Sequence, residues 1–392
     1  MKKSLYASLL GMAFLLFLAL LQSPLFLGAA PLLDSTKLAP PCNMRVLAPL
    51  DGDYTSPLWS LSGGGLLSGG RWVSFEGDSC RVLEEFSLGA EYTPFGFDAS
   101  RGVVFSLKEG GETSDIYLYQ VKRKEQRLLP LPVKKSWRKI RILDPSLSPG
   151  GDVVAVFQKE SDDSNVKECY VFALDAHGKR FRQLTDSAVH VVKSKMLFMG
   201  KKVAYGKLRS PQMSRDGRFC AYLSLEERDP KRLLYDLCIA GHDRTSRVLK
   251  EDLASCGAPA WSPDGAAVAF KAAGEKGEYE LSIVEAGGGV RARVPVGTKV
   301  KNAGDDPGNV SWSFDGEWIA FTGDEGRSLK VVTKKGQGLS TVFQVKTVEG
   351  VENPEYLWEP RWSPHGPDLA FLQLSAGKGK TPSFLYVARL SH

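Results

Sequence analysis

The chain has 392 residues, of which 43% are hydrophobic and 24% are charged. This composition is ordinary for a folded globular protein and excludes a disordered or collagen-like chain. The formal net charge is +6, but the basic residues are scattered in short clusters. The sequence therefore lacks the concentrated basic face that nucleic-acid binding needs. Glycine is enriched at 40 residues, which favours a fold with many tight turns.

The first thirty residues have the pattern of an export signal. Lys2 and Lys3 precede an apolar run from Leu5 to Leu21, and three small residues follow at 28–30. A basic start, an apolar centre and a small-residue cleavage site define a signal peptide. The run is also long enough to span a bilayer, and Pro31 follows the predicted cut, so an uncleaved membrane anchor is the alternative. In either case we expect an exported, periplasmic or extracytoplasmic protein, tethered to the inner membrane if the signal is uncleaved.

A short motif recurs along the rest of the chain. Its best copies read PAWSPDGAAVAF (259–270), VSWSFDGEWIAF (310–321) and PRWSPHGPDLAF (360–371). Looser copies begin at Pro145 and Pro211, and degenerate copies begin at Pro57 and Pro94. The glycines of the seven copies fall at positions 63, 102, 151, 217, 265, 316 and 366. A repeat of about fifty β-type residues indicates an all-β protein built as a single β-propeller of seven blades. Six blades is the alternative if the first degenerate copy is not a blade.

Each repeat predicts four strands. An apolar motif residue, usually Trp, packs an inner strand against the neighbouring blade, and the Pro/Asp-Gly that follows makes a tight turn. The last repeat lacks a fourth strand, whereas the segment Asn43 to Leu47 is a strand without a repeat. We predict that this N-terminal strand completes the last blade and closes the ring. The chain then divides into 1–30, a signal peptide or anchor, 31–55, a segment with the closing strand, and 56–392, the propeller.

The core Trp-Ser-Pro-Asp-Gly-x-x-[Val/Ile]-Ala-Phe, as at 261–270, resembles the WD-like repeats of the TolB propeller family of bacterial periplasmic proteins. The resemblance is strongest over residues 145–392. Similar repeats occur in the propeller domains attached to prolyl oligopeptidase-type peptidases. The resemblance implies a TolB-type propeller that lacks the α/β N-terminal domain of TolB, because only about fifteen residues separate Cys42 from the first repeat. No Gly-x-Ser-x-Gly nucleophile elbow occurs.

The sequence offers few residues for chemistry. His177, His242 and His365 fall in predicted turns, and no two histidines have metal-ligand spacing, so we expect no metal and no cofactor. No CxxC pair occurs among the six cysteines. A symmetric hairpin centred on Asp229 would place Cys220 opposite Cys238, close enough for a disulfide. Two buried free thiols are the alternative.

Binding residues are expected where the chain enters the inner strands. In propellers of this type those connections surround one mouth of the central channel. Aromatic and Arg side chains dominate binding hot spots. The candidates are Trp137, Arg138, Arg209, Tyr356 and Trp358.

These features predict a monomeric exported module that binds a protein or an envelope polymer, with no nucleic-acid partner and with membrane contact only through an uncleaved N-terminus. The alternative is a propeller enzyme, a polysaccharide lyase or hydrolase, with its site at the channel mouth. Such an enzyme needs a converging acid and base. The scarcity of histidine favours binding over catalysis.

Overall fold

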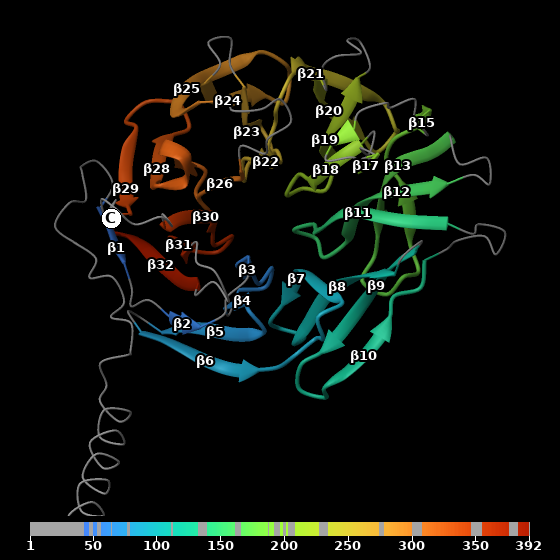
Figure 1. The fold of residues 1–392 in the computed structure, drawn as a ribbon, viewed down its shortest axis with the longest axis horizontal. Coiled ribbons are helices and arrows are strands. Elements are labelled where there is room, and N and C mark those ends of the chain that lie inside the picture. Colours follow the sequence, from blue (N-terminus) through green and yellow to red (C-terminus); the bar gives the residue numbers. More distant parts are fainter. Residues whose placement is uncertain are drawn as a thin grey trace, which may run out of the picture. The chain divides into compact units, whose positions relative to one another are not determined.

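Each repeat folds as a small antiparallel sheet in which the chain runs back and forth. The computed structural model describes residues 43–46, 50–52, 56–63, 65–76, 79–110, 113–131, 139–160, 166–186, 188–191, 197–198, 201–202, 208–226, 234–273, 278–299, 308–345, 355–375 and 383–391. Seven such sheets stand around a central axis (Figure 1). The fold is a seven-bladed β-propeller, as the repeat predicts, and the first degenerate copy is a true blade.

Blades 1 to 6 each contain four strands, which follow the chain from the innermost to the outermost position. Blade 1 consists of β3(Leu58–Trp59), β4(Leu66–Ser68), β5(Arg71–Glu76) and β6(Ser79–Glu85), and blade 2 of β7(Tyr92–Asp98), β8(Val103–Gly110), β9(Thr113–Gln120) and β10(Glu125–Leu128). Blade 3 consists of β11(Lys139–Leu147), β12(Val153–Glu160), β13(Val166–Leu174) and β14(Phe181–Gln183), and blade 4 of β18(Leu208–Met213), β19(Phe219–Glu226), β20(Leu234–Gly241) and β21(Ser246–Leu253). Blade 5 consists of β22(Ala260–Trp261), β23(Ala267–Ala273), β24(Glu278–Glu285) and β25(Val290–Lys299), and blade 6 of β26(Val310–Trp312), β27(Trp318–Gly323), β28(Ser328–Thr333) and β29(Ser340–Gln344).

Two additions interrupt this regular plan between blades 3 and 4. A further short strand, β15 (Ala188–Val191), pairs with β13 of blade 3 beside β14. The insertion that follows contains a small hairpin of β16 (Leu197–Phe198) and β17 (Lys201–Lys202). The outer edge of blade 3 is therefore made of two separate strands rather than one.

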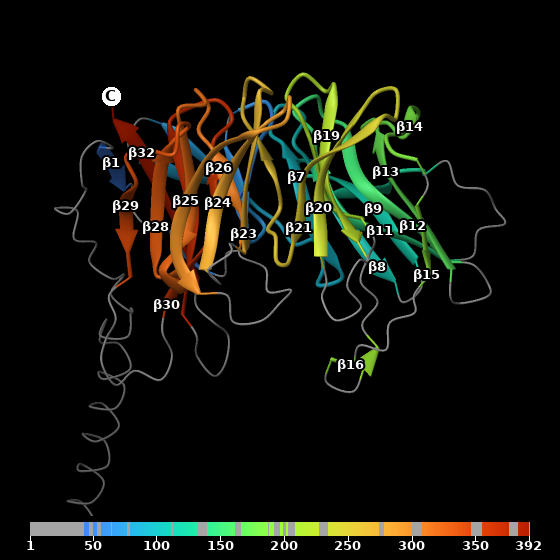
Figure 2. The same ribbon diagram turned by 90° about the horizontal axis from the view of Figure 1, so that it is seen from above.

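Blade 7 is completed by both ends of the chain. It contains β30 (Glu355–Trp362), β31 (Asp368–Ser375) and β32 (Ser383–Ser391). The N-terminal strand β1 (Asn43–Val46) pairs antiparallel with β32, and β2 (Leu50–Gly52) pairs further along the same strand. The blades stand side by side when the ring is seen edge-on (Figure 2), with β1 beside β32. The predicted closing strand is present.

The Ser-x-Asp-Gly part of the motif builds the turn between the first two strands of a blade. In blade 5 the Ala267 N–H donates to Ser262 Oγ, and the Ala266 N–H donates to Asp264 Oδ1, both at 3.0 Å. Gly265 has a φ of +69°, which glycine adopts without steric cost. Equivalent bonds occur in blades 4 and 6. The motif is therefore mainly a turn and packing code.

The motif tryptophans link neighbouring inner strands. Their indole N–H groups donate to a main-chain carbonyl of the preceding blade, in the pairs Trp261 to Gln212 (2.9 Å), Trp312 to Ala260 (3.0 Å) and Trp59 to Arg361 (2.7 Å). The last pair joins blade 1 to blade 7. In the turns that directly follow strands β3 and β30, His365 Nε2 donates to the carbonyl of Leu61 across the same junction. Trp362 differs, because its buried Nε1–H has no hydrogen-bond partner.

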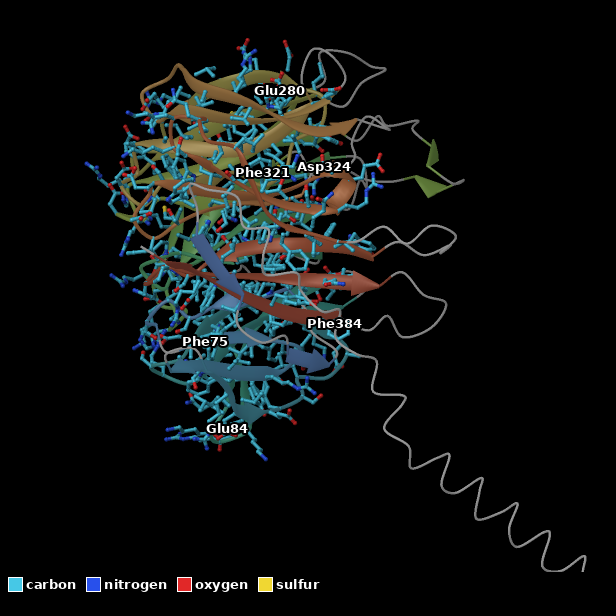
Figure 3. All side chains as sticks on the ribbon, turned by 90° about the vertical axis from the view of Figure 1, so that its left-hand side faces the viewer. Phe75, Glu84, Glu280, Phe321, Asp324 and Phe384 are labelled. Carbon is cyan, nitrogen blue, oxygen red and sulfur yellow. The ribbon has the colours of Figure 1, made fainter. Side chains whose placement is uncertain are left out.

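The hydrophobic core lies between adjacent blades. Phe270, Phe321 and Phe371 occupy the same motif position and are fully buried. The outermost strands are polar, so Glu84 of β6 is exposed while Phe321 lies inside the protein (Figure 3). Within the described residues, no helix has the length and apolar character to cross a bilayer. The predicted signal segment 1–30 lies outside those residues.

The predicted opposition of Cys220 and Cys238 is wrong. β19 and β20 pair Cys220 with Ala240, and Cys238 with Tyr222. This register is centred on position 230, one residue later than the symmetric hairpin that the sequence reasoning assumed, so the two cysteines are offset by two residues. Both are buried free thiols, and burial raises the pKa of Cys220 to about 12. The two thiols pack in the core between blades 3 and 4.

Candidate binding site at the channel mouth

Three of the five predicted binding residues lie on innermost strands of two blades. Tyr356 and Trp358 belong to β30, and Arg209 belongs to β18. All three lie in the first half of their strand, at the end where the chain enters from the preceding blade. Because β18 and β30 are three blades apart in the ring (Figure 1), the structure does not place Arg209 beside the two aromatic residues. Trp137 and Arg138 lie outside the described residues.

The inner strands of blades 3, 4 and 7 share a kink just before a proline. Asp144, Ser210 and Glu359 have φ angles of +48°, +50° and +46°, and the strand pairing slips at the same place. A left-handed φ costs a residue other than glycine about 1–2 kcal/mol. Backbone strain of this kind concentrates at functional sites. The kink recurs in the innermost strands of three blades, which are the strands that face the central axis.

The kink of blade 4 is held by a carboxylate from blade 3. Asp144 Oδ2 accepts a hydrogen bond from the Ser210 N–H at 2.9 Å and lies 3.8 Å from Arg209 Nε. The Arg209 side chain is 40% exposed. Arg209 is therefore paired with Asp144 of the neighbouring blade, and part of its charge is used in this contact between blades.

Blade 7 carries a second charged pair around its kink. Arg361 Nη2 lies 3.5 Å from Glu359 Oε2, and the Arg361 side chain is 39% exposed. Arg361 Nε is buried and has no hydrogen-bond partner among the described residues. The guanidinium thus retains donor capacity beside Tyr356 and Trp358 on the same strand.

A short loop of blade 6 packs against this strand. The loop contains the 3₁₀ turn η3 (Asp324–Gly326), and a Cβ built on Gly326 would lie 3.4 Å from the Tyr356 Cβ. Arg327 Nη2 lies 3.7 Å from Glu325 Oε2. Burial pulls the pKa of Asp324 upward, but hydrogen bonds from Ser328 and Lys330 outweigh it and lower that pKa. Asp324 therefore fixes the loop as an anion, and Tyr356 is supported from blade 6.

Trp358 stands out by its exposure. Its side chain is 41% exposed, although it lies on an innermost strand. The other large hydrophobic residues exposed in the described structure belong to the outermost strands or the turns that enter them: Leu83, Leu128, Val248, Val290 and Leu339. A large exposed aromatic ring beside Arg and Glu side chains is typical of a binding hot spot.

Sequence reasoning missed Asp144, Glu359 and Arg361 as residues of the mouth. The signal that could have found them is a charged residue directly beside the motif proline, as in Asp144-Pro145 and Glu359-Pro360-Arg361. The residue before a proline is normally extended. For this reason the left-handed kink itself is not expected from the sequence.

The mouth residues offer hydrogen bonds and an aromatic surface rather than a cluster of metal ligands. Within the described parts of the chain, no group of three or more His, Cys, Asp or Glu side chains could hold a metal ion. The turns that contain His177, His242 and His365 lie at the opposite end of the blades from the mouth, as predicted for turns. The mouth therefore has the composition of a recognition surface.

The repeats and the ring agree with a comparison against protein families. Residues 204–384 match the family model described as the TolB beta propeller domain. This part of the chain matches a TolB-type β-propeller. The matched residues fall within the region 145–392 where the sequence resemblance is strongest, and blades 1 to 3 share the architecture without matching the family model.

Solved structures show the same fold for the TolB-type propeller. An oligogalacturonate lyase in complex with manganese aligns with a TM-score of 0.53 and 13% identity, over 90% of this chain and 98% of the other. An oligogalacturonate lyase from Vibrio parahaemolyticus aligns with a TM-score of 0.53 and 14% identity, over 88% and 92%. TolB from Acinetobacter baumannii aligns with a TM-score of 0.45 and 13% identity, over 80% and 67%. At these identities the two lyase alignments establish the fold alone.

Proposed function

We propose that the chain is an exported binding protein whose channel mouth on blade 7 recognises a protein or an envelope polymer. The observation that carries the proposal is Trp358, an exposed indole on an innermost strand, flanked by Tyr356 and by the Glu359–Arg361 pair. The apolar run from Leu5 to Leu21 supports export. The TolB-type propeller supports a periplasmic site of action.

The rigidity of this surface favours affinity. Tyr356 packs on the loop of blade 6, and Arg361 is fixed through its carbonyl by the Trp59 indole. A preorganised surface loses little conformational entropy when a partner binds. Aromatic anchors of this kind contribute about 2 kcal/mol or more each when truncated.

The test uses the full chain with Trp358→Ala and Tyr356→Ala together. We expect partner capture from an envelope extract to weaken by about thirtyfold or more, since 1.4 kcal/mol corresponds to tenfold. Leu128→Ala is the matched control, because Leu128 is 50% exposed but lies on an outermost strand. If both variants retain the same partner with unchanged affinity, the mouth of blade 7 is not the binding surface.

A polysaccharide-cleaving enzyme is the second candidate. Two oligogalacturonate lyases align over most of this chain, and the mouth holds Arg, Tyr and carboxylate side chains. Incubating the purified protein with oligogalacturonate, with and without Mn²⁺, and measuring unsaturated product at 235 nm tests this directly. Product formation that is lost in Arg361→Ala would favour the enzyme over the binding module.

A further inference from the structure

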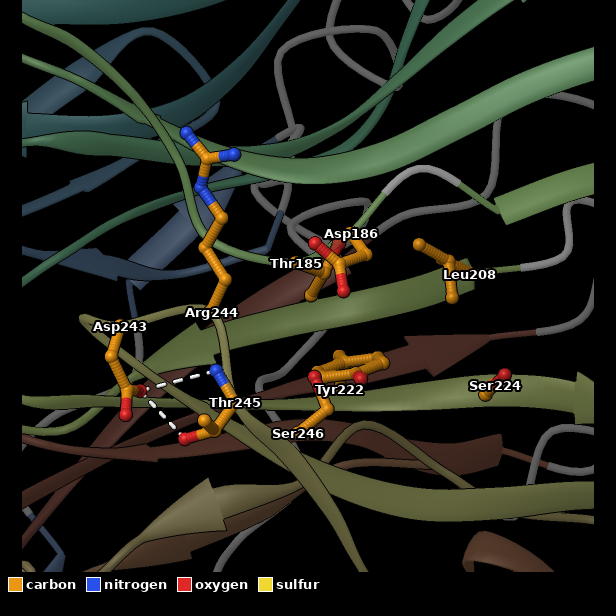
Figure 4. Close-up of a pocket in the computed structure, with 9 residues that line it drawn as sticks. All are labelled: Thr185, Asp186, Leu208, Tyr222, Ser224, Asp243, Arg244, Thr245 and Ser246. Carbon is orange, nitrogen blue, oxygen red and sulfur yellow. Dashed lines mark hydrogen bonds between the residues drawn. The ribbon is translucent and has the colours of Figure 1, made fainter.

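A cavity lies between blades 3 and 4, away from the mouth surface of blade 7. Its volume is about 570 Å³ (Figure 4), which is within the usual range of roughly 300–1,000 Å³ for small-molecule sites. It opens where the outer edge of blade 3 changes from β14 to β15. Thr185 and Asp186 border it from blade 3, and β18, β19 and the turn between β20 and β21 border it from blade 4.

The lining of this cavity is rich in hydroxyl groups. Five hydroxyls from three separate segments line it, those of Thr185, Tyr222, Ser224, Thr245 and Ser246. The Tyr222 ring is 5% exposed at the base of the cavity and its hydroxyl bonds to Ser246. Burial raises the pKa of Tyr222, so the phenol keeps its proton at neutral pH. The Thr245 and Ser224 hydroxyls already donate to Asp243 and Glu226, so they remain acceptors. The Thr185 hydroxyl accepts from the Val171 N–H, so it remains a donor.

Arg244 occupies a backbone position that three other blades give to glycine and blade 2 gives to Lys124. In blades 3, 5 and 6 the turn before the outermost strand has glycine at its fourth residue, with a positive φ: Gly178, Gly288 and Gly336. In blade 4 that residue is Arg244, with a φ of +65°, and its N–H makes the same bond to the carbonyl three residues earlier. A side chain at a left-handed position is unfavourable for folding. Arg244 therefore supplies a guanidinium to the cavity, and its left-handed backbone lowers the stability of the turn.

Two charged groups of the cavity remain uncommitted. The Arg244 guanidinium and the Asp186 carboxylate make no hydrogen bond or ion pair with other described residues. Asp243, by contrast, accepts hydrogen bonds from the Thr245 N–H at 3.1 Å and the Thr245 hydroxyl at 2.6 Å. The Arg244 side chain extends away from Asp243 (Figure 4). The cavity thus presents one pure donor, one pure acceptor and several hydroxyls.

We propose that this cavity binds a neutral saccharide unit. A saccharide carries hydroxyls at many adjacent positions, so it can accept from Arg244, donate to Asp186 and pair with the donor or acceptor capacity that the lining hydroxyls retain. Two carboxylates against one guanidinium give the lining a formal charge of −1, which disfavours an acidic sugar. The site is independent of the channel mouth, and it is formed entirely by blades 3 and 4.

The test uses ligand-observed NMR on the full chain with three probes: cellobiose, N,N′-diacetylchitobiose and digalacturonate. We expect one of the neutral disaccharides to bind and digalacturonate to bind at least fivefold more weakly. Arg244→Gly should weaken the neutral disaccharide about tenfold, because a hydrogen bond to a charged group is lost. The same change relieves the left-handed arginine, so thermal stability should be retained or raised.

Lys124→Gly is the matched control. Lys124 has a φ of +55° at the same turn position of blade 2, outside the cavity. It should raise stability in the same way and leave binding unchanged. Absence of binding by both neutral disaccharides overturns the proposal. So does binding that survives Arg244→Gly, or binding that is lost only in Trp358→Ala.

Discussion

The indole hydrogen bonds between blades can be measured with one pair of tryptophans. Trp312 and Trp362 occupy the same motif position, and their side chains are 7% and 5% exposed. Trp312 Nε1–H donates to the Ala260 carbonyl at 3.0 Å, whereas Trp362 Nε1–H is buried without a partner. The two sites therefore differ in one hydrogen bond at nearly equal burial.

Replacement by Phe separates packing from hydrogen bonding. Both changes lose packing worth about 2 kcal/mol, at roughly 0.8 kcal/mol per methylene-sized group. Trp312→Phe also leaves a carbonyl without its donor, for about 1 kcal/mol more. Trp362→Phe removes a buried unsatisfied N–H, which returns about 1–2 kcal/mol. We expect losses of about 3 kcal/mol for Trp312→Phe and about 0–1 kcal/mol for Trp362→Phe.

Urea denaturation followed by tryptophan fluorescence and far-UV circular dichroism measures the difference. The midpoint should fall clearly for Trp312→Phe and little for Trp362→Phe, with unchanged dependence on urea concentration. Equal losses of stability in the two variants would refute the inference that these indole bonds contribute to the stability of the ring.

Three further predictions follow from the turns and the buried thiols. Gly217→Ala should lose about 1–2 kcal/mol of stability, because Gly217 has a φ of +71°. Gly366→Ala at the same motif position should be neutral. Equal melting temperatures of the two variants would contradict this prediction. Cys220 and Cys238 should both be alkylated by iodoacetamide after unfolding without reductant, and an unlabelled pair would indicate a disulfide. Hydrogen bonds, first from the Arg218 N–H, lower the pKa of Asp216 to about 2, and the Lys179 N–H does the same for Asp175. Carboxylates with depressed pKa values stabilise the fold above their ordinary value of 3.8, so the melting temperature should fall as the pH drops from about 4 to about 2. A melting temperature independent of pH across that window would exclude this contribution.

The architecture was predictable because the repeat is a turn and packing code. Trp261, Asp264 and Gly265 each have a local structural role that the sequence reveals, and their period fixes the number of blades. The closing strand was predictable because the last repeat lacks a fourth strand and the segment Asn43 to Leu47 is a strand outside any repeat. Both predictions rest on the preferences of single residues and on the number of strands in each repeat.

Register and strain were not predictable in the same way. The offset of Cys220 from Cys238 depends on a one-residue shift in the centre of a hairpin, which no local residue preference specifies. The kinks at Ser210 and Glu359 contradict the usual conformation before proline, so they arise from contacts between blades, such as the Asp144 carboxylate on the Ser210 N–H. The cavity beside Arg244 likewise requires two blades to meet.

The union of β1 with β32 also sets the order of events during biosynthesis. Asn43 lies opposite Ser391, so the N-terminal strand cannot pair with its partner until almost the whole chain has been made. Such a distant pairing is slow, because the entropy lost in closing a long loop precedes any contact that could offset it. A message truncated before the nine residues of β32 would leave two unsatisfied sheet edges facing one another. The last strand therefore determines whether the ring is closed or leaves exposed sheet edges.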